Sequence, residues 1–188
     1  TITDTGALTV GGAGSFTTAQ ADQAITLNTT TNAMTGAVTF TTATGGGNTG
    51  NVTIDNGTTA LNLGTSTIRG SLTAISGNVG GISDSGTVTV TGTGSFATDA
   101  NSGVLNLDQL AVGGALTLNT NGTGTATIVN ASAIVLAANT RIGGATSITA
   151  TTGNITDSGT FTVGAGGASF VTTANDATIN LGTLAVTG

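Results

Sequence analysis

The chain has 188 residues, of which only 5% are charged, and its formal net charge is −6. Thr supplies 45 residues and Gly 32, whereas Lys, Glu, His, Cys, Pro, Trp and Tyr are absent. Without Cys and His there can be no disulfide framework, thiolate zinc site or imidazole base. Two Arg in an acidic chain cannot neutralise a row of phosphates, so we expect no nucleic-acid partner and no polybasic membrane contact.

The apolar residues are dispersed along the chain. They make up 37% of it, but they alternate with Thr, Ser and Asn. A membrane-spanning helix needs about 20 consecutive apolar residues, so we expect no membrane insertion. Disordered chains have fewer β-branched residues and more net charge, so we expect a folded chain. Because the sequence begins with Thr1 rather than Met, we expect it to be part of a longer protein.

Short segments in which apolar and small polar residues alternate predict β-strands along the whole chain. In chain order these segments are 7–10, 24–27, 37–40, 51–54, 87–90, 104–107, 115–118 and 160–163. Thr and Val favour strands, whereas the Gly-rich intervals between them disfavour helix. No segment combines a helical period of about 3.6 with helix caps, so we predict an all-β fold.

The sequence also repeats itself over a long period. The pentapeptide at 2–6, Ile-Thr-Asp-Thr-Gly, recurs with small changes at 82–86 and 155–159. A Ser-Phe pair follows each copy, and an apolar residue comes nine positions after each Phe. We therefore interpret 1–188 as a single segment with internal repeats at 1–81, 82–154 and, in part, 155–188.

Each long repeat divides into shorter periods, which run in the first copy from Ile2 to Ile25, from there to Ile54, and on to Ile82. A period of this length with about three short strands is typical of one coil of a parallel β-solenoid. The absence of Pro fits, because every coil must donate its N–H groups to a neighbour. We predict seven to eight coils and one interior column of apolar side chains. Its predicted members are Ile2, Ile25, Ile54, Ile82, Leu105, Ile128, Ile155 and Ile179.

The repeats resemble those of filamentous-haemagglutinin-type secreted proteins. The resemblance rests on the runs at 2–10 and 82–90, supported by those at 60–65 and 70–73. It implies a right-handed parallel β-helix, export to the cell surface and a role in adhesion or fibre building. The amino-terminal secretion domain of that family is not recognisable in this sequence.

The charged side chains offer few candidate sites. The three Asp-x-Gly sequences at Asp4, Asp84 and Asp157 read as turns in which Asp accepts backbone N–H groups and Gly takes a positive φ. A column of carboxylates for calcium or a sugar is the alternative. We expect the copies to lie three coils apart, about 14 Å, which is too far for a glycosidase pair. We therefore predict no catalytic, cofactor or metal residues and no enzyme activity.

Other residues also have simple structural interpretations. We expect the Phe residues of the three Ser-Phe pairs, Phe16, Phe96 and Phe170, to stack in the interior. Arg69 and Arg141 are expected to pair with an Asp or a carbonyl at a coil corner. Thr-x-Thr runs can order water on a solenoid face. Here they look scattered along the sequence, which argues against ice binding.

The sequence favours a structural shaft segment of a large secreted bacterial adhesin, surface fibre or biofilm-matrix filament. Its expected partners are neighbouring β-coils at both ends, in the same long chain or in like subunits, with surface glycans as a second class. Its expected location is extracellular or on the cell surface. The alternative function is a carbohydrate- or ice-binding solenoid module that uses an exposed Thr/Asn face.

Overall fold

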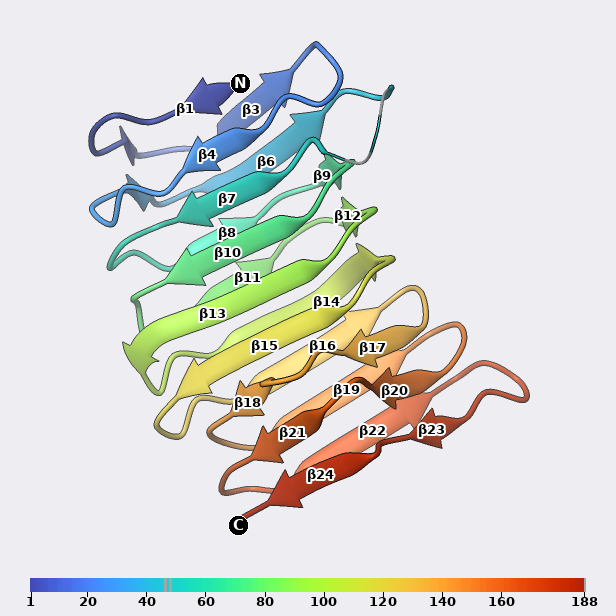
Figure 1. The fold of residues 1–188 in the computed structure, drawn as a ribbon. Coiled ribbons are helices and arrows are strands. Elements are labelled where there is room, and N and C mark those ends of the chain that lie inside the picture. Colours follow the sequence, from blue (N-terminus) through green and yellow to red (C-terminus); the bar gives the residue numbers. More distant parts are fainter. Residues whose placement is uncertain (46, 48, 188) are drawn as a thin grey trace.

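The computed structural model describes residues 1–45, 47 and 49–187, and Asn101 by its backbone alone. All regular secondary structure in this part consists of strands, 24 in number. They pair in parallel and stack as a β-solenoid of about eight turns (Figure 1), which confirms the predicted fold class. Seen from the amino terminus in Figure 1, the chain winds clockwise as it recedes, so the solenoid is right-handed.

Two large sheets form the walls of the solenoid, a front sheet nearer the viewer in Figure 1 and a back sheet behind it. The front sheet contains β1 (Ile2–Thr3), β4 (Ile25–Leu27), β7 (Val52–Asp55), β10 (Leu72–Ser76), β13 (Gly94–Asn101), β15 (Leu116–Asn121), β17 (Ile134–Leu136), β18 (Arg141–Ile142), β20 (Ile155–Asp157), β21 (Thr160–Val163), β23 (Ile179–Asn180) and β24 (Thr183–Val186). The back sheet contains β3 (Gly14–Thr18), β6 (Ala37–Thr42), β8 (Leu61–Leu63), β9 (Ser66–Ile68), β11 (Ile82–Asp84), β12 (Val88–Val90), β14 (Leu105–Val112), β16 (Ala126–Asn130), β19 (Thr146–Ala150) and β22 (Ala168–Thr172). A separate pair joins β2 (Thr9–Val10) to β5 (Ala33–Met34).

Most turns of the described chain contain three strands, as the sequence predicts, but two contain only two. In those turns one long strand takes the place of two short ones: β14 pairs with both β11 and β12, and β15 pairs with both β17 and β18. The length of chain between hydrogen-bonded partners in successive turns varies. It is short from Val52 to its partner Leu72 and longer from Ile25 to its partner Val52. The turns thus differ in length at the corners while the ladders stay continuous.

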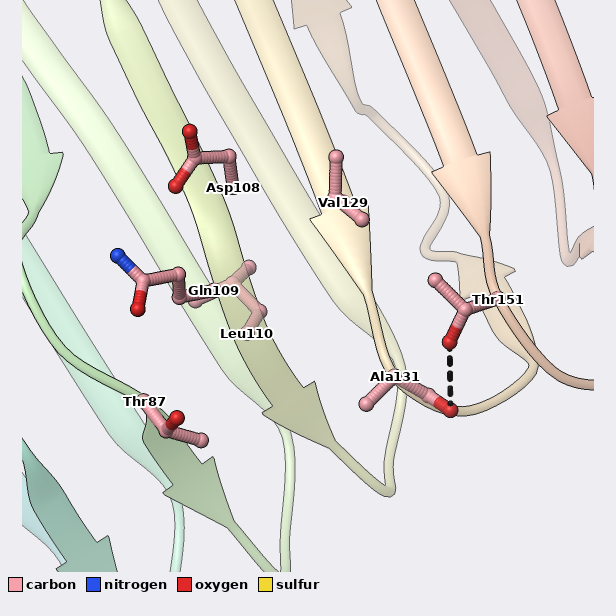
Figure 2. Close-up of a pocket in the computed structure, with 7 residues that line it drawn as sticks. All are labelled: Thr87, Asp108, Gln109, Leu110, Val129, Ala131 and Thr151. Carbon is pink, nitrogen blue, oxygen red and sulfur yellow. Dashed lines mark hydrogen bonds between the residues drawn. The ribbon is translucent and has the colours of Figure 1, made fainter.

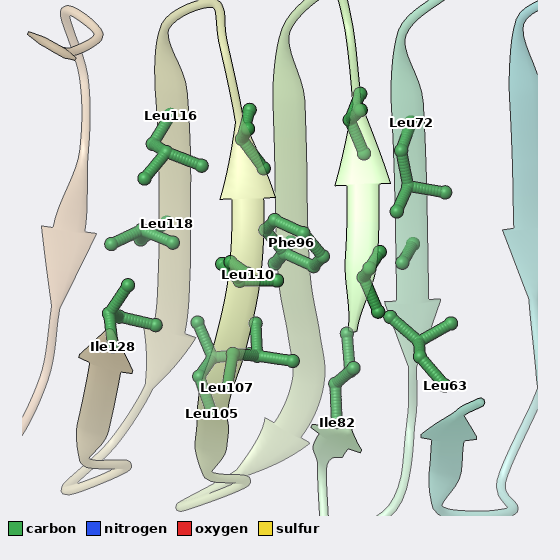
Figure 3. Packing of buried hydrophobic residues seen from close by; sticks show 14 of the residues in the cluster. Leu63, Leu72, Ile82, Phe96, Leu105, Leu107, Leu110, Leu116, Leu118 and Ile128 are labelled. Carbon is green, nitrogen blue, oxygen red and sulfur yellow. The ribbon is translucent and has the colours of Figure 1, made fainter. Parts of the chain in front are cut away.

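Alternation along the strands builds the core. In β10, for example, Leu72, Ala74 and Ser76 are buried while Thr73 and Ile75 face outward. Figure 3 shows the apolar side chains of both sheets meeting in the narrow space between them. Phe96 is fully buried there, as predicted, whereas Phe16 and Phe170 are only partly buried against the core. Phe16 stacks on Phe40 with a centroid distance of 5.9 Å.

The predicted single interior column is wrong. Ile2 pairs with Ile25 and Ile155 with Ile179 in the front sheet, as expected. However, Ile25 pairs with Val52 rather than Ile54. Three further members of the column, Ile82, Leu105 and Ile128, belong to strands of the back sheet. Most turns in the structure contain fewer residues than the periods inferred from the sequence. Residues chosen at those periods therefore start in the front sheet and later fall in the back sheet.

The same shortening changes how the long repeats are related. Going back one turn at a time through the back-sheet pairings, β11 leads to β8, then β6, then β3, which lies half a turn after β1. Asp4 and Asp84 are therefore three and a half turns apart rather than three, and they lie on opposite sheets. Asp157 returns to the front sheet after a further three and a half turns.

Local conformation is nevertheless kept between the three copies. The residue six positions after each repeat Phe has a left-handed backbone, namely Asp22, Ser102 and Asp176, with φ of 61°, 64° and 59°. Non-Gly residues adopt this conformation rarely, and Asp tolerates it better than most. Each long repeat therefore specifies the same corner conformation. The corner lies on opposite sides of the solenoid in successive copies, because the copies are offset by half a turn.

Candidate functional site

The three Asp carboxylates each hold two backbone N–H groups of the following turn. Asp84 Oδ1 accepts from the N–H of Asp108 at 3.1 Å and Oδ2 from that of Gln109 at 3.0 Å. Asp157 binds the N–H groups of Gly182 and Thr183 in the same way, at 2.8 and 3.3 Å. Asp4 does so with Asn28 and Thr29. Their shared role is to join one coil to the next where the strand ladder is interrupted.

The expectation that Gly in these sequences takes a positive φ is wrong. Gly6, Gly86 and Gly159 are absent from the left-handed residues of the described chain. A Cβ on Gly86 would collide with Thr65 of the preceding turn. At two of the three copies Gly is therefore needed for close approach between coils, because a Cβ on Gly159 would also press on the turn before it, at 2.7 Å from the Ala138 Cβ.

Two of these carboxyls differ in acidity despite their common role. Burial raises the pKa of Asp84 above its ordinary value of 3.8, and the nearby Asp108 carboxylate adds to this, while the two N–H donors oppose it. For Asp4, burial acts in the same direction but is outweighed by hydrogen bonds from Asn32, Thr29 and Asn28, so its pKa is lowered. The difference in pKa comes first from the deeper burial of Asp84 and then from the neighbours, an acid beside Asp84 and an amide donor beside Asp4.

A shallow depression of about 180 Å³ lies beside Asp84 on the outside of the back sheet (Figure 2). Its lining residues are Thr87, Asp108, Gln109, Leu110, Val129, Ala131 and Thr151. Thr151 Oγ1 donates to the carbonyl of Ala131 at 3.2 Å. Asp108 is the one charged residue among those seven.

Metal-ligating side chains are sparse in the described ranges. No group of three or more Asp residues there could hold an ion. Nor does the described chain contain a helix long and apolar enough to cross a membrane. Arg69 and Arg141 both have exposed side chains. Their backbone N–H groups donate to Thr42 Oγ1 and Asn119 Oδ1, so the hydrogen bonds at these corners involve the backbone rather than the guanidinium.

Buried asparagine amides form a set of contacts that the sequence analysis missed. Asn56 is fully buried, accepts from the Met34 N–H at 2.8 Å and donates to the Met34 carbonyl at 3.0 Å. Asn130 does the same with Val112, at 2.8 and 3.0 Å. Asn32 accepts from the Leu8 N–H. The amides of Asn56 and Asn130 thus pair with the backbone of the preceding turn as a further backbone unit would. No feature of the neighbouring sequence distinguishes these Asn residues from exposed ones.

Outward-facing hydroxyls form continuous ladders, contrary to the scattered arrangement inferred from the sequence. The front ladder has one hydroxyl in each of six successive turns, namely Thr3, Thr26, Thr53, Thr73, Ser95 and Thr117. The back ladder comprises Thr17, Thr41, Thr67 and Thr89. Each of its members has another Ser or Thr two positions earlier. Neighbouring rungs of such ladders are about 4.8 Å apart.

The last described turn presents interior columns without a covering strand. Ile179 stacks on Ile155, and β24 continues the columns of β21, with Leu184 on Phe161 and Val186 on Val163. The partners from the preceding turn, Ile155, Phe161 and Val163, are fully buried, whereas Ile179, Leu184 and Val186 are 44%, 38% and 43% exposed. These residues form the last described coil of this sequence (Figure 1, red).

Continuous parallel ladders, an interior of stacked apolar residues and a recurring corner define a β-solenoid repeat protein. The sequence matches the family described as repeats of unknown function (DUF5649) over residues 1–41 and 49–109, more than half of the chain. The chain belongs to this family. Comparison with curated proteins and with solved structures finds no match.

Proposed function

We propose that the chain is a shaft segment of a large secreted bacterial adhesin or extracellular fibre, related to filamentous-haemagglutinin-type proteins. The right-handed parallel solenoid and the repeats at 2–10 and 82–90 support this proposal. Stability in such a shaft is the sum of nearest-neighbour coil interfaces, so it grows with length. A surface of Thr and Asn with no Lys suits exposure to proteases outside the cell.

The observation that carries the proposal is the unbroken parallel stacking of coils, in which the apolar columns continue from turn to turn as far as Ile179, Leu184 and Val186. An open sheet edge that carries apolar side chains pairs readily with another strand. We propose that a further β-coil stacks end to end on such an edge and continues the shaft. This coil belongs either to the same long chain or to a separate subunit.

The end-to-end contact can be tested in solution with one substitution and a matched control. Leu184→Asp places a charge on the uncovered column, whereas Val79→Asp places one on the 65% exposed Val79 at a corner between β10 and β11. Sedimentation velocity of the segment at rising concentration should show association that Leu184→Asp abolishes and Val79→Asp leaves intact. A wild-type segment that stays monomeric at high concentration, or an equal effect of both substitutions, would contradict the proposal.

The proposed location has its own experiment. Antibodies raised against the segment should label intact, unpermeabilised cells that carry the gene, and electron microscopy should find the label along continuous filaments. Labelling that requires permeabilisation would place the protein inside the cell and refute the extracellular assignment.

The back ladder favours a second candidate function, a carbohydrate- or ice-binding module. Four successive turns present paired hydroxyls at a regular spacing, which suits a partner that is itself a neutral array of hydroxyls or ordered water. Thr67→Lys should then abolish binding to insoluble polysaccharide or the inhibition of ice growth. Thr127→Lys lies on β16 of the same sheet, outside the back ladder and nearer the carboxyl terminus, and should leave the activity unchanged. Wild-type protein without either activity would remove this candidate.

A further inference from the structure

Two Asn-Gly sequences occur in the chain, at Asn56-Gly57 and Asn121-Gly122. The glycines share a left-handed backbone, with φ of 54° at Gly57 and 58° at Gly122. Gly has no side chain to shield its backbone nitrogen, so a preceding Asn is open to intramolecular attack. The two sites therefore match in sequence and glycine φ, and they differ in their surroundings.

At Asn56 both reacting groups are held. The side chain is fully buried, and its amide nitrogen donates to the carbonyls of Met34 and Ala60 at 3.0 and 2.9 Å. The Gly57 N–H, which must lose its proton before it can attack, donates to the Asp55 carboxylate at 2.8 Å. A carboxylate acceptor stabilises the backbone amide in its N–H form and so opposes loss of this proton. Reaction at Asn56 therefore requires local opening of the fold.

At Asn121 the corresponding groups are accessible. The residue is exposed, and its amide nitrogen makes only two long hydrogen bonds, to the carbonyls of Thr98 at 3.3 Å and Asp99 at 3.2 Å. Gly122 lies in an exposed turn directly after β15, and among the described backbone contacts outside the strands its N–H has no carbonyl acceptor.

We propose that Asn121 is a site of spontaneous deamidation in the folded protein and that the fold protects Asn56. Hydroxide removes the Gly122 amide proton, and the resulting nitrogen attacks Cγ of Asn121. The new C–N bond closes a succinimide ring while the Cγ–Nδ2 bond breaks and ammonia leaves. Water then opens the ring at either carbonyl and gives Asp or isoaspartate, and no oxidation or reduction occurs.

The product changes one corner of the solenoid and leaves the interior in place. The Asn121 carbonyl accepts from the N–H groups of Ser102 and Gly124, both at 3.0 Å, and so fixes this corner to the preceding turn. A carboxylate cannot donate to the carbonyls that Asn121 now contacts, and isoaspartate lengthens the backbone by one carbon.

Peptide mapping by mass spectrometry after incubation of the folded segment at mildly alkaline pH tests the proposal. The Asn121 peptide should convert at least about a hundredfold faster than the Asn56 peptide, because Asn56 must wait for local opening. In urea the two peptides should convert at similar rates, which makes the unfolded chain the matched control. Asn121→Gln should remove the isoaspartate that forms in the folded protein. Equal rates in the folded state, or no conversion of Asn121 until urea is added, would overturn the proposal.

Discussion

Replacing Asn130 by Ala tests whether the buried amides stabilise the stack of turns. The Asn130 side chain is fully buried, and its Oδ1 is hydrogen-bonded to the Val112 N–H at 2.8 Å. Removal of the amide leaves that N–H buried without a partner, which costs about 1–3 kcal/mol. The Val112 carbonyl keeps the bond from Ser132 Oγ at 2.7 Å, so it adds little to the loss. With the lost packing, we expect the free energy of unfolding to fall by about 2–4 kcal/mol.

A change of Asn130→Asp gives a second, pH-dependent test at the same position. The introduced carboxyl would keep an acceptor for the Val112 N–H but lose the donor, and burial would raise its pKa. A carboxyl with a raised pKa in the folded state contributes stability at low pH that is lost as the pH rises through that pKa. Asn130→Asp should therefore be more damaging at neutral pH than in acid.

Urea unfolding followed by circular dichroism measures these changes, with Asn106→Ala as the control. Asn106 is exposed on β14, and we expect its replacement to cost under about 0.5 kcal/mol. Similar losses for Asn130→Ala and Asn106→Ala would show that the buried amides contribute nothing specific and would refute the reasoning.

Three further predictions use thermal unfolding. Phe96→Ala should cost about 3 kcal/mol or more, because the ring is fully buried, whereas Thr89→Ala on the outer face should cost under about 1 kcal/mol; equal melting temperatures for the two variants would contradict the assigned faces. Gly81→Ala should cost at least about 2 kcal/mol, since φ is 64° and a methyl group there would overlap a carbonyl oxygen of the next turn; an unchanged melting temperature would argue against this corner. The raised pKa of Asp84 contributes stability that is lost as the pH rises above 3.8, whereas the lowered pKa of Asp4 contributes stability that is lost as the pH falls below 3.8. Asp84→Asn and Asp4→Asn should therefore change the dependence of melting temperature on pH in opposite directions. Changes in the same direction would contradict the assignment.

The alternating pattern was enough to predict the strands, because a period of two directly states which face is buried, and the longer repeat period was enough to predict the solenoid. It was not enough to predict the length of each turn. Apolar residues occupy inner positions in both sheets, for example Ile25 in the front sheet and Ile82 in the back sheet. Their spacing in the sequence therefore does not distinguish a full turn from a half turn. Corner lengths vary, and only the hydrogen-bond register decides which residues stack.

The candidate sites divide in the same way. The Asp residues were recognised as hydrogen-bond acceptors at turns, but their N–H partners lie a whole turn further along the chain, as for Asp84 with Asp108 and Asp157 with Thr183. Such partners depend on stacking and cannot be found from local sequence. The hydroxyl ladders were missed for the same reason, since Thr3 and Thr26 come together only when the turn length is known.

The half-turn offset between long repeats has a consequence for how the gene can change length. Recombination between copies adds or removes one long repeat, the interval from Ile2 to Ile82 or from Ile82 to Ile155. Loss of one copy shortens the solenoid by three and a half turns and rotates everything downstream to the opposite side. Loss of two copies restores the original facing. Any part of the solenoid that follows the altered copies therefore keeps its orientation only when an even number of copies is gained or lost.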